Sequence, residues 1–235
     1  MSSCGWPSPV DRDQVGLRDD FLRHFFSELC WYSHVTFGDL SRAGKSTVSG
    51  AVAERLNKDK EVAVVLPMDG WHLTKKDLFD QYGEEHGMMR RGAPWTFDVP
   101  RICKDLARAK VEREGSFPIY SRDISDPVEN GVQLKKTHEV VIVEGLFVLW
   151  KEDKAWGQLY DLFDERWFIK VPSRDEQIDR LVQRSKHNWF PDKIERWGPF
   201  PDGARKRAEF NDVKNMDLLV DCEKHADEVI VSRSQ

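Results

Sequence analysis

The sequence contains few cysteines, no long apolar run and no excess of basic residues, and each absence excludes a class of protein. Its four cysteines lie far apart, without the close pairs of a zinc site or the density of a secreted disulfide scaffold. No apolar run approaches the roughly 18 to 20 residues that are needed to span a bilayer. The start of the chain is too acidic for a transit peptide. We therefore expect a cytoplasmic protein with reduced thiols.

The net charge further limits the partners that this chain can have. With 36 basic and 41 acidic residues, the formal charge is −5. The chain therefore lacks the overall positive field that concentrates proteins on phosphate backbones or on anionic lipid. We expect neither a nucleic acid nor a membrane as its partner.

The apolar pattern indicates one α/β domain. A chain of 235 residues with 40% hydrophobic content can bury a full core, and compact apolar runs alternate with helical periodicity, as in a mainly parallel sheet covered on both sides. The predicted strands are residues 35–37, 61–68, 117–120, 140–146 and 166–171, with 218–220 and 228–231 closing the sheet. The predicted helices are residues 14–31, 48–56, 73–82, 100–111 and 175–184. Residues 185–207, rich in Lys, Arg, Trp, Pro and Gly, are predicted to be irregular or mobile.

A candidate phosphate-binding loop lies between the first predicted strand and the helix that follows it. Such a loop needs glycines that let backbone N–H groups turn inward on an anion, a lysine for the β and γ phosphates, and a hydroxyl for magnesium. The run Ala43-Gly44-Lys45-Ser46-Thr47 supplies the second half of this pattern in full. The helix that begins there adds its positive N-terminal dipole. These residues predict a site for ATP and Mg²⁺.

The first half of this loop departs from the G-x-x-x-x-G-K-[ST] pattern. The position five before Gly44 is Asp39, and the nearest glycine is Gly38. A carboxylate that faces phosphates lowers the affinity for ATP through like-charge repulsion. Alternatively, the loop is one residue longer and Gly38 still makes its turn. The sequence leaves both interpretations open.

An acidic residue follows the second predicted strand, in the run Met68-Asp69-Gly70-Trp71-His72. Open α/β sheets bind their ligands at the carboxyl ends of their strands, so Asp69 could accept the proton of an attacking substrate hydroxyl. The alternative is that Asp-Gly only forms a turn. His72 either orients a substrate or is a structural histidine that bonds to backbone.

Three segments resemble the successive signatures of the uridine kinase-like P-loop family, which includes phosphoribulokinase and pantothenate kinase. These are residues 68–73 (MDGWHL), 90–98 (RRGAPWTFD) and 142–149 (IVEGLFVL). They look closest to the branch of fructose-transport-kinase-like proteins and fungal P-loop ATPases, and the resemblance runs from about residue 35 to 220. It implies a three-layer α/β/α P-loop NTPase fold with a mainly parallel sheet. We expect an N-terminal segment at 1–34, with its periodic helix, to pack on a P-loop kinase-like domain at 35–235 that has a lid at about 185–207.

The family pattern implies roles for the residues that match it. Lys45 and Ser46 would contact the nucleotide phosphates and magnesium, and Asp69 would be the catalytic base. Glu144 would hold magnesium through water from the position of the Walker B acid. The residues expected on the acceptor side are His72, Arg90, Arg91, Phe97, Asp98, Tyr120 and Arg122.

Two arginines of the helix predicted at 175–184 resemble the lid arginines that clamp the transferring phosphoryl group in this family. Arg180 and Arg184 are four residues apart and share one helix face, and a planar guanidinium binds phosphate oxygens in pairs. The alternative for this pair, and for the pair Arg90 and Arg91, is ordinary solvated surface charge.

The resemblance implies an ATP-dependent kinase that phosphorylates a hydroxyl of a small-molecule substrate, either a nucleoside, a sugar or a pantothenate-like alcohol, as a monomer or a homodimer. Uridine is the less expected acceptor, because Asp69-Gly70-Trp71-His72 looks closer to the pantothenate kinase-like version of the motif. Two alternatives remain: a P-loop ATPase without a small-molecule acceptor, and a nucleotide-binding regulatory protein that has lost turnover. Asp39 is the main support for the second alternative.

Overall fold

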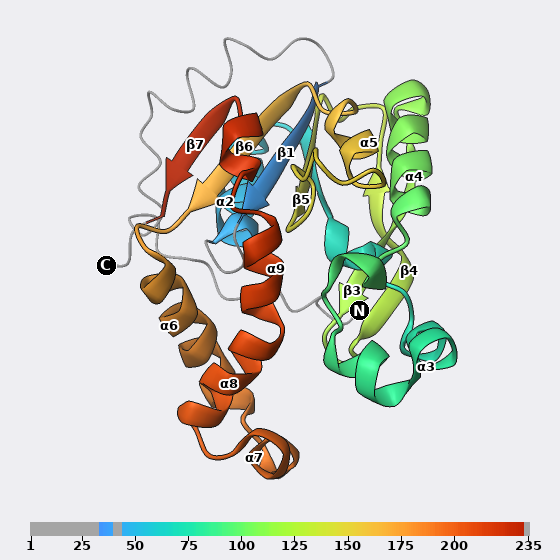
Figure 1. Cartoon of the computed structure of the whole chain (residues 1–235). Helices are drawn as coiled ribbons and strands as arrows, with labels where there is room; N and C mark the ends of the chain where they lie inside the picture. Colours follow the sequence, from blue (N-terminus) through green and yellow to red (C-terminus); the bar gives the residue numbers. More distant parts are fainter. Residues whose placement is uncertain (1–32, 40–43, 233–235) are drawn as a thin grey trace.

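The computed structural model describes residues 33–39 and 44–232, so the predicted helix at 14–31 lies outside the described residues. Five strands form one sheet in which every neighbouring pair is parallel (Figure 1). Their order across the sheet is β2 (Ala63–Pro67), β5 (Val140–Gly145), β1 (Ser33–Asp39), β6 (Glu165–Lys170) and β7 (Glu228–Val231). The parallel α/β sheet that the sequence predicts is confirmed.

The other elements lie around this sheet. The larger helices are α2 (Lys45–Leu56), α3 (Lys75–Gly83), α4 (Val99–Glu112), α6 (Arg174–Ser185), α7 (Pro191–Trp197), α8 (Asp202–Phe210) and α9 (Asp212–Leu218). The shorter ones are η2 (Met68–Trp71), η3 (Glu84–Met88), η4 (Pro94–Thr96), α5 (Gly157–Tyr160), η5 (Lys186–Asn188) and η6 (Cys222–His225). A separate antiparallel hairpin joins β3 (Gly115–Ser121) and β4 (Asp126–Leu134).

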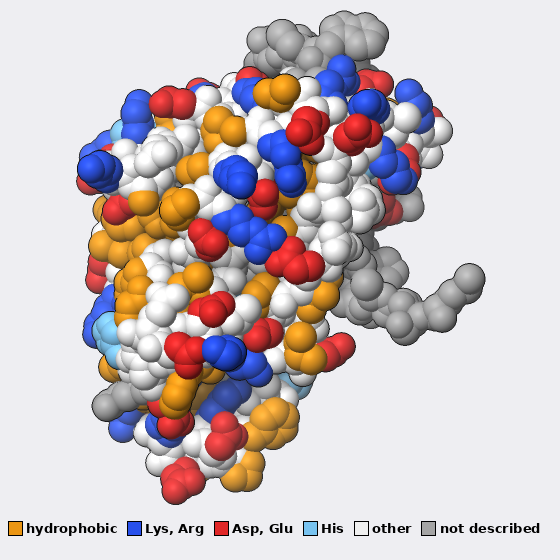
Figure 2. Space-filling model, turned by 90° about the vertical axis from the view of Figure 1, so that its right-hand side faces the viewer, with side chains coloured by type: hydrophobic (Ala, Val, Ile, Leu, Met, Phe, Trp, Pro, Cys, Tyr) orange, Lys and Arg blue, Asp and Glu red, His pale blue; other side chains and the backbone are white. Residues whose placement is uncertain are grey.

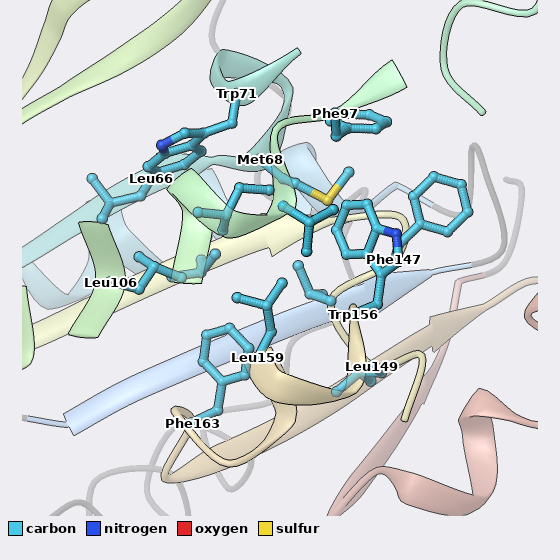
Figure 3. Packing of buried hydrophobic residues seen from close by; sticks show 14 of the residues in the cluster. Leu66, Met68, Trp71, Phe97, Leu106, Phe147, Leu149, Trp156, Leu159 and Phe163 are labelled. Atoms are coloured by element: carbon cyan, nitrogen blue, oxygen red, sulfur yellow. The ribbon is translucent and has the colours of Figure 1, made fainter. Parts of the chain in front are cut away.

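Alternating side chains of β5 separate two apolar layers, as a strand buried on both faces requires. Val140 and Ile142 pack with the apolar residues of α2. Val141 and Val143 pack on the opposite face with residues of α4 and α5. Figure 3 shows part of this second layer, where the rings of Phe147 and Trp156 lie 5.1 Å apart between centroids. The fold therefore has the predicted three layers, with the sheet between helices.

The segment that follows β6 corrects the prediction of an irregular region at 185–207. It contains α7 and most of α8, which pack with α6 and α9 to form an arm of helices (residues 174–218) beside the sheet (Figure 1). Leu181 of α6 packs with Ala208 and Met216. The proline and glycine that indicated a loop mark helix ends instead, because Pro191 opens α7 and Gly198 ends it with φ 96°.

Two smaller predictions also need correction. Residues 218–220 do not form a strand, because Leu218 ends α9 and Leu219 packs in the core. β4 was not predicted, since most of its side chains are exposed or only partly buried and its apolar pattern is weak. The strand predicted at 228–231 is confirmed as β7.

The face that carries α4 and α3 mixes charges of both signs. Figure 2 shows acidic and basic side chains side by side on it, and some are paired, such as Arg101 with Glu129 at 2.7 Å. Within the described ranges, no helix has the length and apolar character needed to cross a membrane.

Candidate active site

The described end of the phosphate loop is Gly44, which precedes α2. Its φ of 102° lies in the left-handed region that glycine adopts without strain. Gly38 lies earlier, inside β1, in register with Gly145 of β5. A Cβ on Gly38 would come within 2.8 Å of the Leu149 side chain, so tight packing requires a glycine there. Gly38 is therefore a strand residue, and the predicted loop residue Ala43 lies outside the described ranges.

Three predicted phosphate-side residues lie together at the start of α2. The hydroxyl of Ser46 donates a hydrogen bond to Glu144 Oε1 at 3.0 Å. Lys45 Nζ lies 3.7 Å from Glu144 Oε2. Glu144 is buried and stands one residue before the end of β5. An ammonium group beside a buried carboxylate offsets part of the cost of burying its charge. Thr47, the next residue of α2, is exposed.

The Ser46 and Glu144 pair has the donor atoms that magnesium prefers. Mg²⁺ is usually held by one or two protein oxygens, together with waters and substrate phosphates. Among the described residues, no group of three or more His, Cys, Asp or Glu side chains could hold a metal ion. A hydroxyl and a carboxylate beside the phosphate loop therefore fit a magnesium ion that is shared with a nucleotide.

Asp69 lies at the same edge of the sheet as this group. Pro67, the last residue of β2, is in register with Glu144, and Asp69 follows two residues later in η2. Its side chain is 57% exposed, so it is open to a ligand. A Cβ on Gly70 would lie 2.2 Å from the carbonyl oxygen of Pro118, so this turn must have a glycine in order to pack on β3.

The ring of His72, three residues after Asp69, lies beside two aromatic side chains. Its ring centroid lies 3.9 Å from that of Phe97 and 5.4 Å from that of Tyr120. Its Nδ1 lies 2.9 Å from the carbonyl oxygen of Asp69. Burial lowers the pKa of His72, although the charge of Asp69 opposes this shift. The contacts match those of a structural histidine that fixes the turn carrying Asp69.

Arg91 connects three segments of the acceptor side. Its Nη2 donates to Asp126 Oδ1 at 2.7 Å, and its Nη1 donates to the carbonyl of Ser125 at 2.6 Å. The guanidinium carbon lies 5.3 Å from the centroid of the Tyr120 ring. Burial raises the pKa of Tyr120. Arg91 is thus engaged with the hairpin, which holds the loop at 90–92 in place.

Two of the predicted acceptor residues have contacts that also support the fold. Phe97 is buried and packs edge-on against Phe147 and Trp156. Asp98 precedes α4 and accepts the backbone N–H of Arg101 at 3.1 Å, as a helix N-cap does. Arg122 is exposed in the turn between β3 and β4. The structure gives these three residues no contact with Asp69 or Lys45.

The two arginines of α6 lie in different surroundings. Arg180 donates to Glu176 Oε1 at 2.7 Å and to the Ser232 hydroxyl at 3.1 Å. That hydroxyl would lie 3.7 Å from a Cβ on Gly44, so Arg180 is held close to the phosphate loop. Arg184, one turn later, is exposed and faces the charge of Asp212. No motif pointed to Ser232, because its position depends on β7 returning to the sheet beside β6.

The sheet order and the group around Glu144 define a P-loop kinase fold, and solved structures agree. A protein from Silicibacter sp. TM1040, provisionally described as a fructose transport system kinase, superposes with a TM-score of 0.73 at 24% identity, covering 89% of this chain and 97% of that one. YFH7 from Saccharomyces cerevisiae superposes with a TM-score of 0.71 at 16% identity, covering 92% and 98%. At these identities the likeness concerns the fold alone.

Sequence comparison leads to the family, although no family model matches the chain. An ATP-dependent kinase-like protein of Aspergillus versicolor, notR', is 30% identical over 122 residues, which cover 50% of this chain and 70% of that protein. The uncharacterised protein YggC of Escherichia coli K12 is 33% identical over 144 residues, covering 60% and 56%. ATP-dependent kinase YFH7 of Zygosaccharomyces rouxii is 24% identical over 217 residues, covering 77% and 55%. The chain belongs to the uridine kinase-like family of P-loop kinases. It spans about half the length of YggC and YFH7.

Proposed function

We propose that this chain is an ATP-dependent kinase that transfers the γ-phosphoryl group of ATP to a hydroxyl of a small metabolite. The observation that carries the proposal is the arrangement at one edge of the sheet. Lys45 and Ser46 meet Glu144 within 3.7 and 3.0 Å, and Asp69 follows the strand that pairs with β5 there. Named relatives include ATP-dependent kinases.

Phosphoryl transfer asks a protein mainly to position the reactants and to neutralise the charge that spreads over oxygens in the transition state. Lys45 would bind the terminal phosphates, and Ser46 with Glu144 would hold magnesium, which supplies further positive charge when bound. Arg180, held beside Gly44 through Ser232, would add a guanidinium on the other side of the phosphates.

Asp69 would act on the acceptor. Its side chain is exposed at the carboxyl end of β2, and a carboxylate there can accept the proton of an attacking hydroxyl. The backbone of η2 is fixed from two sides, by the contact of Gly70 with Pro118 and by the His72 ring on the Asp69 carbonyl. The base would therefore stand at a defined place and need no rearrangement during the reaction.

A thermal-shift measurement tests nucleotide binding directly. MgATP at about 100 times its Kd should raise the melting temperature of the wild type by roughly 5–10 °C. Lys45→Ala should remove most of this rise, because it removes the ammonium that contacts the phosphates. Lys58→Ala, in the exposed turn after α2, is the matched control and should keep the rise. An unchanged melting temperature in the wild type would contradict the proposal.

ADP release, screened over hydroxyl-bearing metabolites, then tests transfer. A kinase should release ADP much faster with one class of acceptor than with water alone. Hydrolysis at one rate with every metabolite would favour an ATPase without an acceptor. Binding of MgATP without release of ADP under any condition would favour a regulatory protein that has lost turnover.

A further inference from the structure

Ser232 has a fixed backbone at the carboxyl edge of the sheet. Its N–H donates to the carbonyl of Lys170, the last residue of β6, at 2.7 Å. β6 is parallel to β1, and Asp39 at the end of β1 is in register with Ile169. Strands β1 and β6 therefore end at the same edge, where open α/β sheets bind their ligands. Ser232 stands at this edge, directly after β7.

Two oxygens of Ser232 accept hydrogen bonds from Arg180. The hydroxyl accepts from Nη1 at 3.1 Å, and the backbone carbonyl accepts from Nη2 at 3.2 Å. Nη2 also donates to Glu176 Oε1 at 2.7 Å. A planar guanidinium with bonds on both of its Nη atoms is held in one orientation, whereas a free arginine side chain samples many rotamers. These contacts therefore define where the positive charge of Arg180 lies.

The hydroxyl of Ser232 also lies close to the phosphate loop. A Cβ on Gly44 would lie 3.7 Å from it, and Lys45 and Ser46 follow at the start of α2. The N-terminus of a helix attracts phosphate through its unpaired N–H groups and its dipole. The guanidinium of Arg180 is thus oriented beside the place where the terminal phosphates would bind.

The helix that carries this arginine has a support apart from Ser232. α6 packs on α8 and α9 through Leu181, and the junction of α8 and α9 is bonded to the loop at 90–92. Arg90 Nη1 donates to the carbonyl of Phe210 at 2.7 Å, and the side-chain amides of Asn211 and Asn215 donate to carbonyls of that loop at 3.0 Å. Because α6 is held in this way, the contact with Ser232 acts mainly on the arginine side chain.

A purely structural ion pair on α6 would not need Ser232. Glu176 and Arg180 are four residues apart on one helix and are 28% and 21% exposed. Such pairs on a helix surface contribute little to stability. The bonds to Ser232 instead join α6 to the end of β7, beside the phosphate loop (Figure 1). This arrangement favours a role for the oriented guanidinium in the site.

We propose that Ser232 is a positioning residue, which orients the guanidinium of Arg180 toward the phosphoryl group that is transferred. This inference rests on the proposed function and adds a residue that no sequence motif indicated. A donor that is already oriented needs no rearrangement when charge develops in the transition state. Loss of the orientation should therefore lower kcat more than the affinity for ATP.

A double-mutant cycle on phosphoryl transfer tests this role. Ser232→Ala should lower kcat about tenfold, as expected for the loss of one hydrogen bond to a charged group, and should leave the KM of ATP within about threefold. Ser232→Thr, which keeps a hydroxyl, should restore most of the rate. In the Arg180→Gln background, Ser232→Ala should have no further effect, because no guanidinium is left to orient. Thr137→Ala, which removes an exposed hydroxyl in the turn before β5, is the matched control.

Three results of this cycle would overturn the inference while the proposed function stands. An equal loss of kcat in both backgrounds would give Ser232 a structural role only. An unchanged kcat in Ser232→Ala would exclude Ser232 from the transfer step. A higher kcat would mean that Ser232 holds Arg180 away from the phosphates. Urea unfolding checks that each variant is folded under the assay conditions.

A mimic of the transition state tests the same role without an acceptor. MgADP with aluminium fluoride imitates the planar phosphoryl group during transfer. Ser232→Ala and Arg180→Gln should each weaken the binding of this mimic about tenfold and leave the Kd of MgADP within about threefold, as for the loss of a bond made mainly in the transition state. Thr137→Ala should change neither.

The outcomes of this binding test separate the two claims. Equal affinity for the mimic in the wild type, Ser232→Ala and Arg180→Gln would overturn the inference alone, even where no acceptor has been identified. A wild type that binds neither MgADP nor the mimic would overturn the proposed function, and the inference with it.

Discussion

The phosphate side and the acceptor side of this site are built in different ways. Lys45, Ser46 and Glu144 come from the start of one helix and the end of one central strand, and the carboxylate is buried. Asp69 and Arg91 depend instead on a short turn, a hairpin and an arm of helices outside the sheet. The group around Glu144 follows from the pairing of β1 with β5 and from the helix that begins directly after the loop. The acceptor side needs long-range contacts, so it can vary while the sheet stays the same.

Asp69→Asn tests whether the two sides are separable, and it has the largest expected effect. Loss of a general base lowers rates by about 10²- to 10⁴-fold, or about 3–5 kcal/mol in activation free energy. Phosphoryl transfer should fall by this factor, whereas the Kd of MgATP should stay within about twofold. Both are measured on one preparation. Asp59→Asn, in the exposed turn after α2, is the control. A large loss of ATP affinity in Asp69→Asn would show that the two sides are not separate.

The buried residue His34 makes the stability of the sheet under the phosphate side depend on pH. This histidine is buried in β1, and burial lowers its pKa from an ordinary 6.5 to about 4, with the charge of Lys110 adding to the shift. Between pH 6.5 and 4, His34 binds a proton in the unfolded chain but stays neutral in the folded chain. The free energy of unfolding should therefore fall as pH drops from about 6.5 to 4, by at most about 3 kcal/mol from this group.

Urea unfolding at pH 7 and pH 5 measures this loss. The fall should be clearly smaller in His34→Asn than in the wild type, whatever the stability of the variant at pH 7. His187→Asn, which changes an exposed histidine in η5, should keep the slope of the wild type. Equal slopes in all three proteins would remove His34 as the cause.

Glu144→Gln tests whether Glu144 belongs to a magnesium site on the phosphate side. The substitution keeps the shape of the side chain and an amide oxygen that can accept the Ser46 hydroxyl bond, but it removes the charge that faces Lys45. Loss of such a supporting carboxylate typically lowers metal affinity about 10- to 100-fold. The Mg²⁺ concentration needed for half of the ATP-induced thermal shift should rise by that factor. A midpoint equal to that of the wild type would exclude Glu144 from the magnesium site.

The pair Arg91 and Asp126 has the smallest expected effect and tests the acceptor side. Its two side chains are 12% and 22% exposed and meet at 2.7 Å. A double-mutant cycle with Arg91→Gln and Asp126→Asn should give a coupling energy of about 1–2 kcal/mol in urea unfolding. The Kd of MgATP should not change in any of the three variants. A coupling near zero would mean that the hairpin does not hold the loop at 90–92.

Local sequence patterns predicted the elements around Gly44. They did not predict the features of the fold that depend on contacts between distant segments. The strand, loop and helix around Gly44 are continuous in sequence, so periodicity and the Gly-Lys-Ser run predicted α2, whereas the resemblance alone indicated Glu144, which the structure places against Ser46. The arm was missed because Pro191 and Gly198 are loop signals that here end a helix. Asp98 matched a family motif, yet it caps α4.

The bonds between residues 90–92 and 210–215 have a consequence for synthesis on the ribosome. Two of them join residues 120 positions apart and the third joins residues 123 positions apart. Because domains tend to fold from the N-terminus as the chain emerges, strands β1, β2 and β5 can pair long before translation reaches Asn215. A nascent chain can therefore bring Lys45 and Ser46 beside Glu144 early, whereas the contact between residues 90–92 and the arm of helices forms only in the last stage of translation.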